Sequence, residues 1–276
     1  MSLIKPFSLL NLSSTMTDLD MGDTAMEGNF PDDIFRFPNL QILNLKLNRQ
    51  LTGYLPKSNW NSSLRKLDIS LSIFLGEIPY SIGNLFFLKV LHIGFCNFTG
   101  SIPTSIGNLT RATEIVFASN HFTGQLPYHV SELSYLTTLD LSGNYFEGRV
   151  PSWLFTLPSL ISINLAWNKL NGPIDPFQWP NSLQDVRLEE NEIRGTIPNS
   201  IFQLVNLTIL DLSSNDLVAQ SDLTSSQTYK SFNFLIFQIT AYSHLPLLPI
   251  SLSNIPYLAL RFCVSLIAMS VSSQVS

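Results

Sequence analysis

The chain has 276 residues, of which 45% are hydrophobic and 13% are charged, and its formal net charge at pH 7 is −5. This length and composition allow a sizeable buried core, and the negative charge argues against a nucleic-acid partner because phosphate binding needs basic patches. The two cysteines, Cys96 and Cys263, lie far apart, so the sequence supplies neither a disulfide framework nor a cysteine metal site.

Residues 1–12 show neither a clear signal peptide nor a clear cap. The start, MSLIKPFSLLNLSS, has one lysine and a short apolar run, without a longer apolar stretch that leads to a small-residue cleavage site. No uncharged apolar stretch of about 20 residues in the chain is free of proline. We therefore predict no clear leader and no convincing transmembrane helix.

A short motif recurs along residues 13–217. It consists of a glycine, then two residues later an aliphatic residue or phenylalanine, and usually a proline directly after that. The glycines are Gly28, Gly53, Gly76, Gly100, Gly124, Gly148, Gly172 and Gly195, spaced by 23 to 25 residues. A period of this length is typical of a solenoid, so we predict about nine stacked repeats.

Each glycine follows a leucine pattern, as in LTTLDLSGNYFEGRVP (136–151). The L-x-L pair alternates with period two, which indicates a short strand with one face in the core and one in solvent. We predict one such parallel strand per repeat. We expect each glycine to allow a tight turn or a close backbone approach.

An asparagine follows three residues after the second leucine of most pairs. A buried amide at this position can bond to the backbones of neighbouring repeats, so we predict a structural ladder. The ladder residues are Asn48, Asn120, Asn144, Asn168, Asn191 and Asn215. Thr24, Ser72 and Cys96 stand in the ladder positions of three N-terminal repeats.

The proline after each glycine suits the start of a short helical turn. The segments TSIGNL (104–109), YHVSEL (128–133), SWLFTL (152–157) and NSIFQL (199–204) each place two apolar residues three apart, as one face of a short helix requires. Asp175 replaces the proline in one repeat, so we expect that helical turn to lack its rigid start.

The composite pattern L-x-x-L-x-x-L-x-L-x-x-N-x-L-x-G-x-I-P resembles the plant extracellular leucine-rich repeat. The chain is similar to plant receptor-like proteins of the tomato disease-resistance type. The resemblance implies an α/β solenoid, a horseshoe or superhelix with a parallel concave sheet and short convex helical turns. It also implies that the protein is located at the extracellular face of the plasma membrane. Members usually have a signal peptide, a cysteine-paired cap, more repeats and a membrane helix, so we expect a truncated relative.

Residues 218–276 carry no repeat and are apolar, with Asp222, Lys230 and Arg261 as their charges. The stretch from Phe232 to Ile250 is the best membrane candidate, but two prolines interrupt it. We expect this tail to be poorly ordered and not to continue the sheet. We interpret it as the mark of a truncated or wrongly spliced gene product.

No catalytic motif is present, and the four histidines fall in different repeats or in the tail. We therefore predict a non-enzymatic protein without cofactor or metal. The position between the paired leucines lies on the solvent face of the predicted sheet and commonly holds Asp or Asn in this type of repeat. Other residues at this position, together with exposed aromatic residues nearby, indicate a binding surface. The ligand-binding candidates are His92, Phe95, Trp167, Arg187, Glu189 and Glu190. Partial packing against a neighbouring strand, or local charge balance around Arg187, are the alternatives.

The resemblance implies a module that recognises a protein or peptide ligand, including a pathogen-derived one, with a co-receptor and a role in defence. Two alternatives stay open, a fragment of a receptor-kinase ectodomain in development and a secreted inhibitor of the polygalacturonase-inhibitor type. The missing paired cysteines count against the inhibitor. N-glycosylation sequons occur at Asn11, Asn61, Asn97, Asn108 and Asn206, about as many as expected by chance.

Overall fold

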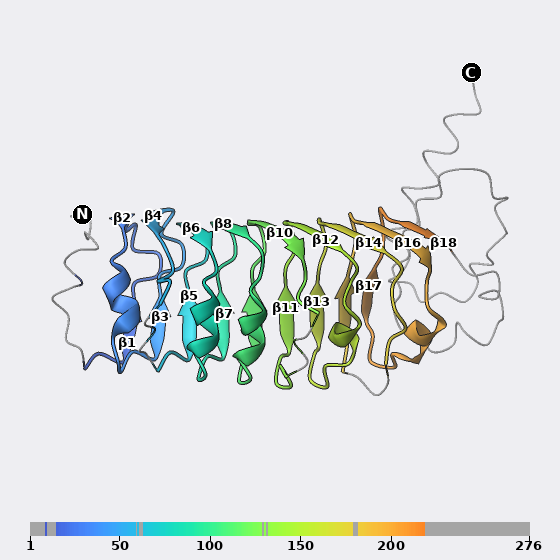
Figure 1. Cartoon of the computed structure of the whole chain (residues 1–276), viewed down its shortest axis with the longest axis horizontal. Coiled ribbons are helices and arrows are strands. Elements are labelled where there is room, and N and C mark those ends of the chain that lie inside the picture. The colour runs from blue at the N-terminus through green and yellow to red at the C-terminus, as the bar shows by residue number, and fades with distance from the viewer. Residues whose placement is uncertain are drawn as a thin grey trace, which may run out of the picture.

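The computed structural model describes residues 9, 15–58, 60, 63–128, 130, 132–178 and 182–218. The predictions for the tail beyond Val218, and the sequon at Asn61, fall outside these residues. Over the described part, the chain winds into an elongated array of similar coils that stack along one axis (Figure 1). Each coil contributes one strand to each of two parallel sheets.

The first sheet contains one strand per repeat, as predicted. The middle residue of each of these strands is buried. We call it the concave sheet, and the helical turns lie on the opposite, convex side. The nine strands pair in parallel in chain order. They are β1 (Asp18–Asp20), β3 (Ile42–Asn44), β5 (Lys66–Asp68), β7 (Val90–His92), β9 (Glu114–Val116), β11 (Thr138–Asp140), β13 (Ser162–Asn164), β15 (Asp185–Arg187) and β17 (Ile209–Asp211).

A second parallel sheet, which was not predicted from the sequence, is formed by the segments around the motif glycines. Its strands are β2 (Glu27–Asn29), β4 (Gln50–Gly53), β6 (Ile73–Glu77), β8 (Asn97–Gly100), β10 (His121–Gln125), β12 (Tyr145–Gly148), β14 (Lys169–Gly172), β16 (Glu192–Thr196) and β18 (Asp216–Val218). The expected turn is also present: Gly148 has a φ of +79°, which suits glycine, and an added Cβ would lie 2.9 Å from Gln125 Cγ.

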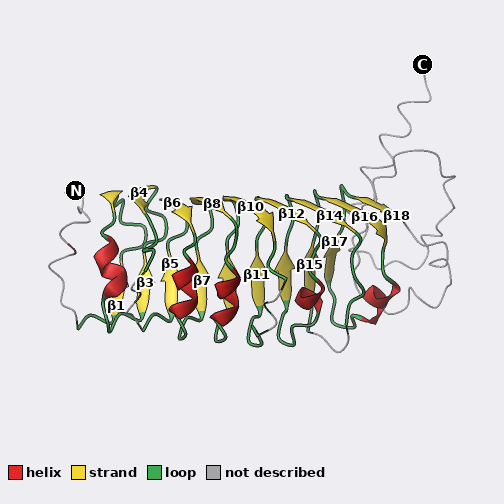
Figure 2. Ribbon diagram, in the orientation of Figure 1, coloured by secondary structure: helices red, strands yellow, loops and turns green. Residues whose placement is uncertain are grey.

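The helical turns of the convex side are 3-10 turns (Figure 2), which is more specific than the helical turns predicted. They are η2 (Asp32–Arg36), η3 (Tyr80–Asn84), η4 (Thr104–Asn108), η5 (Ser152–Phe155) and η6 (Asn199–Gln203). A proline with extended backbone precedes each one, for example Pro103 with φ −69° and ψ 143° before η4. Residues 173–178, around Asp175, form no helical turn, which agrees with the missing proline. YHVSEL lies partly outside the described residues.

The core between the two sheets contains a column of phenylalanines from the second sheet. Phe122 stacks on Phe98 with ring centroids 6.1 Å apart and on Phe146 at 6.0 Å, with interplanar angles of 2° and 9°. All three side chains are fully buried. Offset stacking of this kind adds to the free energy gained by burying the rings.

The predicted ladder asparagines bond to two repeats each. Asn144 accepts a hydrogen bond on Oδ1 from the Phe122 N–H at 3.1 Å, and its Nδ2 donates to the carbonyl oxygens of Phe117 at 3.0 Å and Leu141 at 3.1 Å. Asn48, Asn120, Asn168, Asn191 and Asn215 make the corresponding bonds. Each amide therefore satisfies backbone groups that the stacking of repeats removes from water.

The three residues that replace the ladder asparagine keep only part of this bonding. Thr24 Oγ1 donates to the Met21 carbonyl at 2.8 Å, and Ser72 Oγ donates to the Ile69 carbonyl at 2.6 Å. Cys96 is a buried free thiol whose Sγ donates to the same Ile69 carbonyl at 3.2 Å. Burial raises the pKa of the Cys96 thiol, so it stays protonated at neutral pH.

Candidate functional site

Most strands of the concave sheet present two residues to solvent, on either side of the buried middle residue. In β5 only Lys66 does so, because Asp68 is buried. The strands are in register, so side chains at the same strand position form rows across the repeats. Asp68, His92 and Val116 are direct neighbours in one such row. A ligand that lies across the strands would therefore contact consecutive members of a row.

His92 is held between two carboxylates on neighbouring strands. Its Nε2 lies 3.0 Å from Glu114 Oε2, and its Nδ1 lies 3.6 Å from Asp68 Oδ2. Asp68 is only 4% exposed. Burial alone would raise the pKa of its carboxyl, but hydrogen bonds with His92 and Ser70 outweigh burial and hold the pKa below its ordinary value. His92 thus links three strands, and only part of its ring remains open to a ligand.

Phe95 and Trp167 are the two exposed aromatic residues among the candidates, with exposed fractions of 56% and 61%. Both have left-handed backbone, with φ of 55° and 57°, which is uncommon for bulky residues. The Phe95 N–H donates to the Ala118 carbonyl at 2.7 Å, and the Trp167 N–H donates to the Glu189 carbonyl at 2.9 Å. The next repeat therefore holds each aromatic residue in a conformation that leaves more than half of its surface in solvent.

Arg187 pairs with Asp185 on its own strand, with Nε 3.1 Å from Oδ1. The charge balance that the sequence analysis considered thus involves Asp185, a residue it did not single out. Glu189 is half-buried, and its Oε2 has no hydrogen-bond partner. Burial, and then the carboxylate of Asp211, raise the pKa of Glu189 despite the nearby Arg187. Glu190 is exposed, so the C-terminal part of this face is acidic.

The candidate residues form two groups on one face. His92 and Phe95 belong to one repeat, and Trp167 lies three repeats further along, next to the repeat of Arg187, Glu189 and Glu190. At about 4.8 Å per strand, three repeats correspond to roughly 15 Å. The acidic partners Asp68, Glu114 and Asp185 were not predicted from the sequence, although each lies next to the buried centre of a concave strand, as the predicted residues His92 and Arg187 do.

Three of the sequons have described side chains, and all are exposed: Asn97 at the start of β8, Asn108 at the end of η4, and Asn206 after η6. Exposure is compatible with glycan attachment. Glycosylation of these asparagines stays a prediction.

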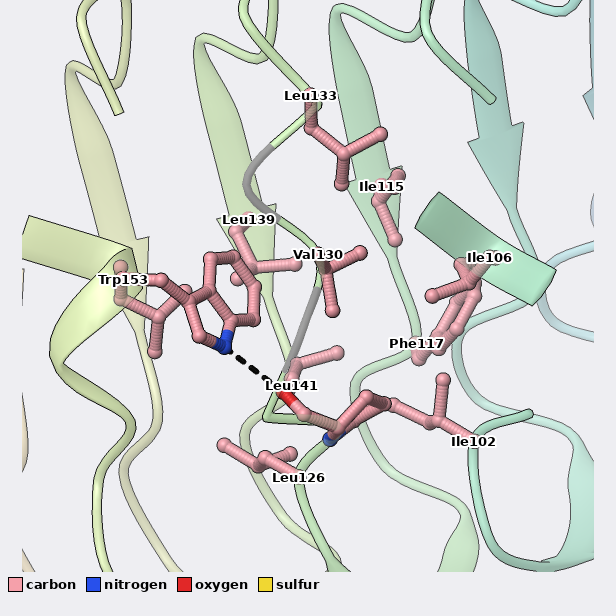
Figure 3. Close-up of a pocket in the computed structure, with 12 residues that line it drawn as sticks. Ile102, Ile106, Ile115, Phe117, Leu126, Val130, Leu133, Leu139, Leu141 and Trp153 are labelled. Carbon is pink, nitrogen blue, oxygen red and sulfur yellow. Dashed lines mark hydrogen bonds between the residues drawn. The ribbon is translucent and has the colours of Figure 1, made fainter. Parts of the chain in front are cut away.

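A small cavity lies inside the array, away from the concave face. Its volume is about 30 Å³, and its lining is apolar, including Ile115, Phe117, Leu139 and Trp153 (Figure 3). Trp153 Nε1 donates to the Pro127 carbonyl at 2.7 Å. The cavity is much smaller than the apolar cavity of about 150 Å³ that holds benzene in another protein, so we assign no ligand to it.

Family comparisons agree with this geometry. Residues 87–109 and 135–157 match the family described as Leucine Rich Repeat, and residues 203–218 match a second Leucine Rich repeat family. The matched segments and the stacked coils show that the described part of the chain folds as a leucine-rich repeat solenoid. In the part of the chain that the structure describes, no helix combines the length and apolar character needed to cross a membrane.

The chain is similar to plant receptor-like proteins. It is 38% identical to receptor-like protein Cf-9 of Solanum pimpinellifolium over 77 residues, which are 27% of this chain and 9% of that protein. It is 37% identical to receptor-like protein 6 of Arabidopsis thaliana over 79 residues, which are 29% of this chain and 8% of that protein. The matches thus span about a tenth of the length of these relatives.

A solved structure with a similar array is the Arabidopsis receptor kinase HAESA in complex with the peptide hormone IDA and the co-receptor SERK1. The TM-score is 0.61 at 28% identity, and the match covers 73% of this chain and 38% of that chain. The chain is therefore similar to a repeat-containing part of this plant receptor kinase.

Proposed function

We propose that this array is a recognition module that binds an extended peptide or a protein loop on its concave sheet. The observation that carries the proposal is the pair of exposed aromatic residues, Phe95 and Trp167, fixed on one face three repeats apart. Aromatic residues dominate the binding energy of many protein interfaces, and their neighbours mainly exclude water. Two anchors roughly 15 Å apart suit a chain of several residues and not a small metabolite.

We further propose that the module belongs to a plant cell-surface receptor-like protein that perceives pathogen-derived proteins or peptides, with a co-receptor. The similarity to Cf-9 and receptor-like protein 6 supports the receptor class. The likeness to HAESA, which was solved with a peptide hormone and a co-receptor, supports a peptide ligand.

A second candidate function is the ectodomain of a receptor kinase that perceives an endogenous peptide in development. The observation that favours this function is that HAESA, whose structure is similar to this array, is a receptor kinase. The two functions differ in the source of the ligand, a pathogen or the plant itself. A screen with both sources of secreted peptides and proteins separates them.

Trp167→Ala and Phe95→Ala are each expected to weaken binding of a captured ligand by about tenfold or more, since aromatic anchors are often binding hot spots. The measurement is a titration of each variant with the ligand recovered from the screen. The matched control is Tyr80→Ala, which removes an aromatic side chain that is 71% exposed on η3 of the convex side. If only the convex change weakens binding, the concave site is wrong.

A further inference from the structure

A row of cations lies along one edge of the array. This edge is formed by the segments that join the convex side to the concave strands, at the bottom of the view in Figure 1. Arg65, Lys89 and Arg111 lie on these segments in three successive repeats, and all three are exposed. The Lys89 N–H donates to the Arg65 carbonyl at 2.8 Å, and the Thr113 N–H donates to the Lys89 carbonyl at 2.8 Å. We call these three residues the basic edge.

The basic edge has no carboxylate partner within the described residues, where none of its three cations forms an ion pair. The acidic residues on the adjacent strands, Asp68 and Glu114, are already bonded to His92. In a chain with a net charge of −5, three neighbouring cations without a counter-charge form a distinct surface. Such a surface attracts an anionic partner.

Exposed aromatic residues accompany these cations. Phe86 and Phe87, between η3 and β7, are 56% and 44% exposed. The guanidinium carbon of Arg111 lies 4.9 Å from the centre of the Phe87 ring, a cation–π contact that holds the guanidinium over the ring. The edge therefore offers both positive charge and apolar surface, and a suitable partner has to supply both complements.

We propose that the basic edge and its two phenylalanines form a subsite for an extended acidic peptide segment. Its carboxylates would pair with Lys89 and Arg111, and an apolar side chain of the same segment would cover Phe86. Successive repeats are about 4.8 Å apart, so Arg65 and Arg111 are separated by roughly 10 Å along the array. Same-face side chains of an extended peptide recur every 6.6 Å or so, and two or three of them span this length.

The apolar surface decides between classes of anionic partner. A phosphate or sulfate chain would satisfy the cations but would leave the exposed Phe86 ring in water. A peptide carries carboxylates and apolar side chains together. The inference rests on the proposed function in one respect, the peptide class of the ligand. It concerns the edge of the array, separate from the anchors Phe95 and Trp167 on the concave sheet.

The test uses the fluorescein-labelled peptide Glu-Gly-Glu-Gly-Phe-Gly-Phe, which in extended form places its acidic and aromatic side chains on one face. Binding to the full chain is measured by fluorescence anisotropy. The test variant combines Lys89→Gln with Arg111→Gln. The matched control combines Arg49→Gln with Arg194→Gln, which removes two exposed cations elsewhere and gives the same net charge. A second peptide has glutamine in place of glutamate.

We expect the test variant to bind the acidic peptide about fivefold more weakly than the wild type, since exposed charge pairs contribute modestly. The control variant should bind the acidic peptide as tightly as the wild type does. The wild type and the control variant should each bind the glutamine peptide more weakly than the acidic peptide. Equal loss in both variants, or no binding of the acidic peptide, would overturn the inference. Binding of a galacturonic acid oligosaccharide at the edge in place of the peptide would show that the partner class is wrong.

Trp167→Ala, measured with the same peptide, separates this inference from the proposed function. If Trp167→Ala weakens binding and the basic-edge variant does not, the peptide binds at the concave site, and the basic edge is not a subsite. If the basic-edge variant alone loses binding, the edge is a peptide subsite, and the concave anchors are judged by the ligand screen.

Discussion

Phe122→Ala is expected to destabilise the array by about 3–5 kcal/mol, the usual cost of truncating a fully buried aromatic residue. Phe122 lies between Phe98 and Phe146 in the stacked column, and its ring centroid is 5.7 Å from that of Phe117. Its removal leaves a cavity between three consecutive repeats. The stack cannot collapse to fill the cavity, because both sheets fix the spacing of the strands.

The measurement is urea unfolding followed by circular dichroism. The control is His121→Ala on the same strand, which removes an exposed ring and should change the unfolding free energy by less than about 1 kcal/mol. Equal destabilisation by the two substitutions would contradict the role given to the phenylalanine column.

Asn144→Ala is expected to lower the free energy of unfolding by about 1–3 kcal/mol, because truncation leaves buried backbone groups without a hydrogen-bond partner. The groups concerned are the Phe122 N–H and the carbonyls of Phe117 and Leu141. The amide is 4% exposed, so water cannot easily replace it. The expected loss of stability comes from the hydrogen bonds that the amide makes between repeats, and not from the smaller volume of the alanine side chain.

The control for this substitution has to be free of such bonds. Asp140 on the concave face is unsuitable, because its Oδ1 accepts hydrogen bonds from Ser142 N–H at 3.0 Å and Ser142 Oγ at 2.6 Å. Glu147→Ala, at an exposed position of β12, is the better control. Thermal unfolding of both variants should show a lower midpoint for Asn144→Ala alone, and identical midpoints would refute the ladder's contribution.

The sequence was sufficient to predict the features that recur in most repeats. The L-x-L pair predicted the concave strands, and the asparagine column predicted the residues that bond between repeats. The second sheet was missed because most of its segments, such as Tyr145–Gly148, contain the motif glycine, which suggests a turn. These segments form strands because stacked neighbours supply the pairing partners, a tertiary effect that local propensity does not contain.

The candidate site was less predictable than the fold. Sequence position placed Phe95, Trp167 and His92 on one face, but it did not show that His92 is held by Asp68 and Glu114 across two strands. Nor did it show the left-handed backbone of Phe95 and Trp167, which depends on hydrogen bonds to the next repeat. Contacts between repeats depend on register, and register becomes visible only when the strands are paired.

The most direct test of the central claim, that the concave sheet binds the ligand, is photocrosslinking. The ligand recovered from the binding screen would carry a photoreactive benzoylphenylalanine, and mass spectrometry would locate the adducts on the chain. We predict adducts within residues 90–95, 162–167 and 185–190, which contain β7, β13 and β15 of the concave sheet together with Phe95 and Trp167. Adducts confined to the convex turns η2 to η6 would contradict the claim.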